Sequence, residues 1–281
     1  MKKIILSISK GKRCIYQFGH KGLPELYCVH GGMGLGSDSL IGLAPLSDIF
    51  DLTFIDLRGC GDSEKAQDEQ YDLRDFTNDI IEIVKTVSKG GPRGIFGHSL
   101  GGMVAIDLLS HSNLFQFSIL ANTAMNDKWR HESSEAVQNM NDANLKNVLE
   151  RYSQNPSDKT IQELATSYGP IYFPELEKVN AKEIMSNFHY RNDASSYTSE
   201  KVYPGMNLAP DVEQISIPTL VIAGNMDVVV PPVCQEELAS LLKKSTLVNI
   251  KDAGHFPFVT RNTEFINSIN NWWKDIREVI Q

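Results

Sequence analysis

Short apolar segments recur along the chain, with turn-forming residues between them. Several are almost continuous runs of Val, Ile, Leu and Phe rather than alternating patterns, which is typical of strands that are covered on both faces of a sheet. The predicted strands are Ile4–Ser9, Arg13–Phe18, Leu26–His30, Leu52–Asp56, Gly94–Gly97, Phe117–Ala121, Thr219–Ala223 and Thr246–Ile250.

Segments with helical periodicity lie between the predicted strands. In Tyr71–Lys89 the apolar residues are spaced by three and four positions, and Gly90-Gly91-Pro92 ends the pattern. The same spacing returns near the C-terminus, where the apolar positions are Phe265, Ile269, Trp272 and Ile276. Because strands alternate with helices, the sequence predicts an α/β fold, with a mostly parallel sheet flanked by helices.

The alternation stops between Met125 and Asp211. This stretch is polar and rich in Asn, Ser, Glu and Tyr, with helical segments but no strand pattern. We interpret residues 125–211 as a helical lid, inserted into a core formed by residues 1–124 and 212–281. Ligands bind α/β sheets at strand ends, and the insertion follows a strand end, so a lid over a binding site is favoured over an excursion without a role.

The chain has 281 residues and a formal net charge of −8, without a cluster of basic residues. A phosphate backbone would be repelled, so we expect a small-molecule substrate and no nucleic-acid partner. With 41% hydrophobic residues, the chain can bury the core of one large α/β domain that carries an insertion. The sequence leaves open whether the protein is a monomer or a homodimer.

The four cysteines, Cys14, Cys28, Cys60 and Cys234, are far apart, and the chain contains no C-x-x-C or H-E-x-x-H. Neither a disulfide framework nor a zinc site is therefore expected, and the thiols suit a reducing compartment. The first residues read as a strand rather than a signal peptide, and no apolar run is long enough to span a bilayer. We expect a cytoplasmic protein without a membrane segment and without a bound metal.

Ser99 stands between two glycines in G-H-S-L-G, at the end of a predicted strand and directly before a predicted helix. A serine at such a sharp turn is held in a strained backbone conformation, and residues two before and two after it, Gly97 and Gly101, are crowded against it. The turn exposes the hydroxyl and directs the helix N-terminus at the same point. We interpret Ser99 as a catalytic nucleophile rather than a capping serine.

A nucleophilic serine needs a base, and the base needs an acid that orients it. His255 is the favoured base among seven histidines, because it follows the last predicted strand on a loop loosened by Gly254. Asp227 follows the preceding strand in a tight turn, so the order is Ser, Asp, His. Asp252 is the rival acid, but it lies only three residues before His255.

An acyl-transfer site also needs donors for the oxyanion. The glycine-rich stretch H-G-G-M-G-L-G follows the strand that ends at His30. We expect the backbone N–H groups of Gly32 and Leu100 to form the oxyanion hole, with Met33 as the alternative to Gly32. A phosphate-binding loop is disfavoured because no Lys-Ser/Thr follows the glycines.

Five motifs in this order resemble the α/β-hydrolase superfamily. They are H-G-G-M-G (30–34), D-L-R-G-C-G-D-S (56–63), G-H-S-L-G-G (97–102), G-N-M-D (224–227) and G-H-F-P (254–257). The resemblance implies the α/β-hydrolase fold, which has an eight-stranded sheet with an inserted helical lid. It also implies a Ser99–Asp227–His255 triad and no cofactor.

The resemblance also bears on single residues and on the branch of the superfamily. It implies that Asp56, Arg58 and Ser63 brace loops by hydrogen bonding, and Ser99 argues against branches with an aspartate nucleophile. The first two motifs are also similar to the proline iminopeptidase branch. That branch has G-G-S-W-G where this chain has G-H-S-L-G, and it holds the amino terminus of its substrate with acids of the lid.

These features favour a serine hydrolase that cleaves a small or medium carboxylic ester through an acyl-enzyme. A proline iminopeptidase-like aminopeptidase, a carbon–carbon bond hydrolase and a non-catalytic small-ligand receptor are the alternatives. Aromatic residues of the lid, mostly tyrosines, predict a partly apolar pocket that takes short acyl groups. They are Tyr152, Tyr168, Tyr172, Phe173, Phe188, Tyr190, Tyr197 and Tyr203.

Overall fold

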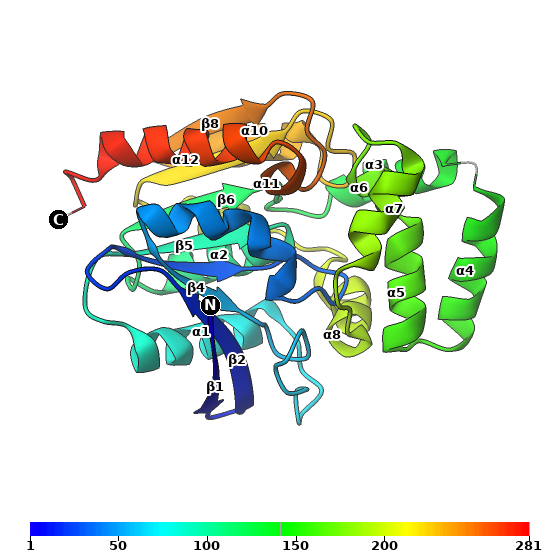
Figure 1. Cartoon of the computed structure of the whole chain (residues 1–281), viewed down its shortest axis with the longest axis horizontal. Helices are drawn as coiled ribbons and strands as arrows, with labels where there is room; N and C mark the ends of the chain where they lie inside the picture. The colour runs from blue at the N-terminus through cyan, green and yellow to red at the C-terminus, as the bar shows by residue number, and fades with distance from the viewer. Residues whose placement is uncertain (141, 281) are drawn as a thin grey trace.

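An eight-stranded sheet runs through the computed structural model, which describes residues 1–140 and 142–280 (Figure 1). Its strands are β1 (Lys2–Ile8), β2 (Gly11–Phe18), β3 (Glu25–Val29), β4 (Asp51–Ile55), β5 (Arg93–His98), β6 (Phe117–Ala121), β7 (Thr219–Gly224) and β8 (Ser245–Ile250). The strand order is β1-β2-β4-β3-β5-β6-β7-β8. Strand β2 is antiparallel to both of its neighbours and all other pairs are parallel, which confirms the predicted, mostly parallel sheet.

Helices flank the sheet and form the insertion. They are η1 (Ser37–Asp48), α1 (Leu73–Val87), α2 (Leu100–His111), α3 (Trp129–Asn139), α4 (Ala143–Gln154), α5 (Asp158–Ser167), α6 (Gly169–Tyr172), α7 (Lys178–Ser186), α8 (Asn192–Tyr197), η2 (Thr198–Val202), α9 (Ala209–Val212), α10 (Pro232–Leu241), α11 (Pro257–Thr260) and α12 (Asn262–Ile276). Within the described residues, no helix has both the length and the apolar character to cross a membrane.

Alternate residues of the central strands enter two separate hydrophobic cores. In β3, Tyr27 and Val29 pack with side chains of α1, α2 and α10, whereas Leu26 and Cys28 pack with η1 and α12. All five residues of β3 are buried. Covering on both faces explains why the parallel strands read as continuous apolar runs rather than alternating ones.

The polar stretch between β6 and β7 forms the helical insertion α3–α8, which lies to one side of the sheet in Figure 1. Its first and last segments are tied together where it leaves the core. The Leu208 N–H donates to the Met125 carbonyl (2.6 Å), and the Asp127 N–H donates to the Met206 carbonyl (3.1 Å). Farther out, Phe173 stacks on Phe256 of the core, with a centroid distance of 5.3 Å. The insertion is therefore anchored both at its base and through its aromatic residues.

The D-L-R-G-C-G-D-S motif follows β4 and braces the surrounding loops, as the family resemblance implies. Asp56 accepts backbone N–H bonds from Ser37 (2.7 Å) and Asp62 (2.8 Å). The Ser63 hydroxyl donates to the Asp56 carbonyl and accepts from the Cys14 N–H. Two side chains of the motif thus join the start of η1 to strand β2.

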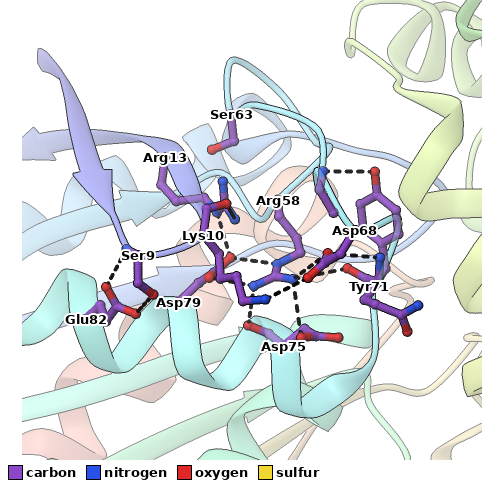
Figure 2. A network of polar contacts seen from close by, with 12 residues as sticks. Ser9, Lys10, Arg13, Arg58, Ser63, Asp68, Tyr71, Asp75, Asp79 and Glu82 are labelled. Carbon is purple, nitrogen blue, oxygen red and sulfur yellow. Dashed lines mark hydrogen bonds and ion pairs between the residues drawn. The ribbon is translucent and has the colours of Figure 1, made fainter.

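The third bracing residue, Arg58, belongs to a buried ionic network around Asp79 of α1 (Figure 2). Asp79 accepts from Arg58 Nε (2.8 Å) and Nη2 (2.7 Å), and from Arg13 Nε of β2 (2.6 Å). At most 3% of each of the three side chains is exposed. Because an uncompensated charge is costly at such burial, one carboxylate holds β2, the loop after β4 and helix α1 together.

The replacement Asp79→Asn tests this network. Removal of the charge leaves buried Arg13 without its counter-ion and Arg58 with only the more exposed Asp75 and Asp68, which should lower the free energy of unfolding by about 3–5 kcal/mol. Urea unfolding followed by circular dichroism measures the change. Glu163→Gln is the control, because Glu163 pairs with exposed Arg151 at the surface of the insertion, and it should leave the transition almost unchanged. Equal stability of wild type and Asp79→Asn would contradict a role for this carboxylate.

Candidate active site

Ser99 occupies the turn between β5 and α2, in a backbone conformation that is rare for a serine. Its φ is +53° and its ψ is −119°. Hydrogen bonds maintain this geometry: the Ser99 N–H donates to the Ala121 carbonyl (3.1 Å), and Thr123 Oγ1 donates to the Ser99 carbonyl (2.7 Å). Such a conformation costs of order 1–3 kcal/mol and persists only where the surroundings enforce it.

The two glycines around Ser99 are required by close packing. A Cβ atom on Gly97 would lie 2.4 Å from the Gly101 carbonyl oxygen, and a Cβ on Gly101 would lie 2.3 Å from the Val29 carbonyl oxygen. Any side chain at either position would therefore push α2 away from β3 and β5. This confirms the crowding that the G-H-S-L-G pattern predicts around the turn.

Asp227 and His255 form a buried hydrogen-bonded pair. His255 Nδ1 lies 2.7 Å from Asp227 Oδ2, and at most 2% of either side chain is exposed. The other carboxylate oxygen, Oδ1, accepts backbone N–H bonds from Val229 (2.8 Å) and Val230 (3.0 Å). A carboxylate with these partners holds Nδ1 of His255 as a donor, which leaves Nε2 as a proton acceptor.

The rival acid, Asp252, makes no such contact. It is exposed, has a φ of +51°, and forms no hydrogen bond with His255 among the described residues. The structure thus pairs His255 with the aspartate that the order of the motifs favours.

Asn122 is a member of the site that the sequence analysis missed. Its Nδ2 donates to Asp227 Oδ2 (2.8 Å) and to the Gly254 carbonyl (3.3 Å). It directly follows β6 with a φ of +47°, a conformation that Asn tolerates better than most residues. Its position in the sequence could have identified it, because polar residues at the carboxyl ends of central parallel strands often belong to a binding site.

The side chain of His98, the neighbour of Ser99, is directed into the protein and not into solvent. It is buried, and its Nε2 lies 2.8 Å from the His255 carbonyl oxygen, while its ring packs against the rings of His255 and Phe256. Burial, and next the proximity of His255, lower the pKa of His98 well below its usual value. A neutral His98 that donates through Nε2 holds the loop of His255 in place.

The predicted oxyanion loop runs beside Ser99 and His98. His30 fixes its start: Nδ1 lies 2.8 Å from the Gly31 carbonyl oxygen, and Nε2 accepts the Leu57 N–H (3.1 Å). A Cβ on Gly31 would lie 3.3 Å from Ser99 Cβ, so the loop backbone runs close beside the serine. Among the described residues, no protein acceptor binds the Gly32 N–H, which stays available to a ligand.

A cavity of about 680 Å³ joins these groups between the sheet and the insertion. Ser99, His255, Gly32 and Met33 line it, and Asp227 lies behind His255. Leu100 begins α2 next to Ser99 and is buried. Within the described part of the chain the Ser99 hydroxyl forms no hydrogen bond, so its link to His255 Nε2 is not made in this state.

The cavity wall contains both apolar and hydroxyl-bearing side chains. The apolar residues include Met103, Val137, Ile161, Leu164, Ile171 and Val229. The hydroxyl-bearing residues include Ser133, Ser134, Ser153, Ser195, Ser196, Ser199, Tyr152, Tyr168, Tyr172 and Tyr203. Of the aromatic lid residues, four tyrosines thus line the cavity, whereas Phe173, Phe188 and Tyr190 are buried in a core. Arg130 and Glu200 are the only charged lid residues in the wall that the structure describes.

One other group of side chains has the spacing of a metal site. The ligand atoms of Cys14, Asp56 and Asp62 lie within 4.8 Å of one another. Asp56 already accepts two backbone N–H bonds, and Asp62 Oδ2 accepts from Lys3 and Tyr16 at 2.5 Å each. The bond from Lys3, followed by that from Tyr16, lowers the pKa of Asp62. These groups are thus engaged in structural bonds.

Comparison with known proteins places the chain among hydrolases. The chain is 22% identical to the proline iminopeptidase PfmaB of Pestalotiopsis fici over 277 residues, covering 90% of this chain and 92% of that protein. It is 21% identical to Lipase 1 of Psychrobacter immobilis over 278 residues, covering 98% and 84%. An α/β fold family hydrolase from Bacillus anthracis superposes with a TM-score of 0.78 at 18% identity, covering 96% and 99%.

The relatives have different substrates, so their shared feature is the fold and the hydrolase class rather than one reaction. The model of the α/β hydrolase fold family matches residues 24–262, from the start of β3 to the start of α12, with the insertion inside that range. This match, together with the strand order and the turn at Ser99, shows that the chain belongs to the α/β-hydrolase fold family.

Proposed function

We propose that this α/β hydrolase cleaves a small or medium carboxylic ester through an acyl-enzyme on Ser99. The observation that carries the proposal is the buried Asp227–His255 pair, which opens on the same cavity as the strained Ser99. Strain at a side chain that faces a cavity, together with an oriented base, is the arrangement that nucleophilic catalysis requires.

In the proposed mechanism, Ser99 Oγ attacks the ester carbonyl while His255 Nε2 takes its proton. His255 then gives the proton to the leaving alcohol, and water repeats the sequence to release the acid. Asp227 keeps the imidazole in the correct tautomer and stabilises its charged form. The bond between Ser99 and His255 forms when substrate binds, since hydrogen bonds of this kind are often long or absent in free enzymes.

The negative charge on the carbonyl oxygen needs donors that are already in place. The Gly32 N–H belongs to the loop after β3 and the Leu100 N–H to the start of α2, and a Cβ on Gly32 would lie 3.6 Å from Leu100 Cβ. In the proposal each contributes roughly 3 kcal/mol to stabilisation of the transition state. The positive end of the α2 dipole acts in the same direction.

The cavity supports a substrate of moderate size that is not purely apolar. A volume of about 680 Å³ is within the range of small-molecule sites, and its apolar side chains can cover an acyl chain of a few carbons. The serine and tyrosine hydroxyls of the insertion favour some polarity elsewhere in the substrate. A long lipid chain matches this wall less well.

An aminopeptidase is the second candidate, because one acid of the insertion reaches the cavity. Glu200 lines the wall and forms no ion pair among the described residues, so its carboxylate could hold a substrate ammonium group. Arg130 lines the same cavity and opposes that attraction. The ester proposal does not depend on either charge and is therefore preferred.

Variants of the two aspartates near His255 test the mechanism. We expect Asp227→Asn to lower kcat for p-nitrophenyl butyrate by roughly 10⁴-fold, because the imidazole then adopts the wrong tautomer. Asp252→Asn is the matched control and should retain wild-type kcat. Ser99→Ala should lose roughly 10⁴–10⁶-fold. Half of the wild-type activity in folded Ser99→Ala, or equal losses in the two aspartate variants, would show that the assignment is wrong.

A substrate panel separates the two candidate functions. We expect turnover of p-nitrophenyl acetate and butyrate, weak turnover of the palmitate ester, and none of proline or alanine arylamides, because the wall fits short acyl groups and does not present an unopposed acid. Steady-state kinetics of the purified protein give the ratios of kcat/KM. Arylamide turnover that is lost in Glu200→Gln would favour the aminopeptidase, and efficient cleavage of long-chain triglycerides would contradict the short-acyl preference.

A further inference from the structure

The hydroxyl of Tyr203 lies directly over the predicted oxyanion loop. A Cβ atom on Gly32 would lie 2.4 Å from Tyr203 Oη, and 3.6 Å from Leu100 Cβ. The phenol therefore occupies the space that the missing side chain of residue 32 leaves open, beside the two residues whose N–H groups are the proposed donors. Tyr203 comes from the insertion, so this group enters the site from the side opposite the sheet.

Hydrogen bonds and ring packing hold Tyr203 in its position. It follows η2, where its N–H donates to the Thr198 carbonyl (3.0 Å), and its carbonyl accepts the Met206 N–H (3.2 Å). Its ring meets the Trp129 indole edge to face, with a centroid distance of 5.2 Å and an interplanar angle of 81°. These contacts belong to the base of the insertion, where its two ends are joined to each other.

The Tyr203 hydroxyl keeps its proton and is available as a donor. Desolvation in the cavity wall raises the pKa of Tyr203 to about 12, against a smaller lowering by the Thr198 hydroxyl. Thr198 Oγ1 gives its own proton to the Ala194 (2.8 Å) and Ser195 (3.2 Å) carbonyls. Among the described residues, Tyr203 Oη has no hydrogen-bond partner other than the Thr198 hydroxyl, and the phenol lines the cavity, where a ligand can accept its proton.

We propose that the Tyr203 hydroxyl is a third oxyanion donor, supplied by the insertion, which binds the carbonyl oxygen of the substrate together with the Gly32 and Leu100 N–H groups. This inference rests on the proposed function of Ser99. The phenol keeps its proton throughout and only shares it, so no covalent step is added. Its hydrogen bond strengthens as charge develops on the oxygen, and it therefore acts on the transition state more than on substrate binding.

Kinetics of Tyr203→Phe test the donor. We expect kcat for p-nitrophenyl butyrate to fall about 10- to 100-fold with KM changed less than about two-fold, because one of three donors is lost. The affinity for a trifluoromethyl ketone, which forms a tetrahedral adduct with the serine, should fall by the same factor. Tyr197→Phe is the matched control, because Tyr197 also belongs to the insertion but donates to Gln70 and Asp72 at its surface.

Two results would overturn the inference. An unchanged kcat in Tyr203→Phe would show that the hydroxyl does not bind the oxyanion, and an increased kcat would show that it covers the site instead. Both results require a wild-type enzyme that hydrolyses esters and loses this activity in Ser99→Ala. They therefore test Tyr203 separately from the proposed function. If the wild type does not turn over esters at all, both proposals fail.

A second pair of variants tests the geometry without any activity measurement. Gly32→Ala brings a methyl group against Tyr203 Oη, and should lower the melting temperature by about 2–10 °C. In the double variant with Tyr203→Phe the oxygen is gone, and the nearest remaining atoms lie at ordinary contact distances of 3.6 and 3.7 Å. The double variant should therefore melt within about 1 °C of Tyr203→Phe alone. An equal loss from Gly32→Ala in both backgrounds would contradict the contact on which the inference depends.

Discussion

A single buried carboxylate, Asp227, connects the loops that make up the candidate site. Its two oxygens receive four hydrogen bonds, from Asn122 after β6, from two N–H groups of its own turn after β7, and from His255 after β8. A carboxylate at this depth would cost several kcal/mol without partners, so the three strand ends are held in one arrangement. The orientation of the imidazole follows from that arrangement and not from a flexible loop.

The insertion forms part of the site as well as a cover over it. The Tyr172 carbonyl of α6 accepts the His255 N–H (2.9 Å), and the Tyr172 hydroxyl contacts Met33 of the proposed oxyanion loop. On the core side, His98 binds the His255 carbonyl. His255 is thus held from both sides, and a change in the position of the insertion would move the imidazole together with the cavity wall. In the proposed mechanism, the insertion therefore affects both substrate selection and the position of the base.

Much of the fold could be predicted because the relevant signals are local. Buried parallel strands produce continuous apolar runs, and the turn at Ser99 needs glycines at fixed spacing, so both appear within a few residues. The order of Ser99, Asp227 and His255 along the chain also predicted that Asp227 pairs with His255, although the two are distant in sequence. Asn122, His98 and Tyr203 could not be assigned in this way, because their roles arise from contacts with residues far away in the chain.

The ionic network around Asp79 shows the same limit. Nothing in the local sequence of α1 distinguishes Asp79 from the other acids of that helix, and its partner Arg13 lies 66 residues away. Only the antiparallel pairing of β2 with β4 brings the two arginines to one carboxylate. In the insertion, the aromatic residues predicted a partly apolar pocket, but which of them line the cavity and which are buried in the core depends on how the short helices pack.

Covalent labelling shows whether Ser99 is a nucleophile that the Asp227–His255 pair activates. A fluorophosphonate probe reacts only with an activated serine, and intact mass spectrometry with peptide mapping locates the adduct. We expect one phosphonyl group per chain, on Ser99, and much slower labelling of Asp227→Asn. Folded wild-type protein that stays unlabelled, or that is labelled at another serine, would contradict this role of Ser99 and favour a small-ligand receptor.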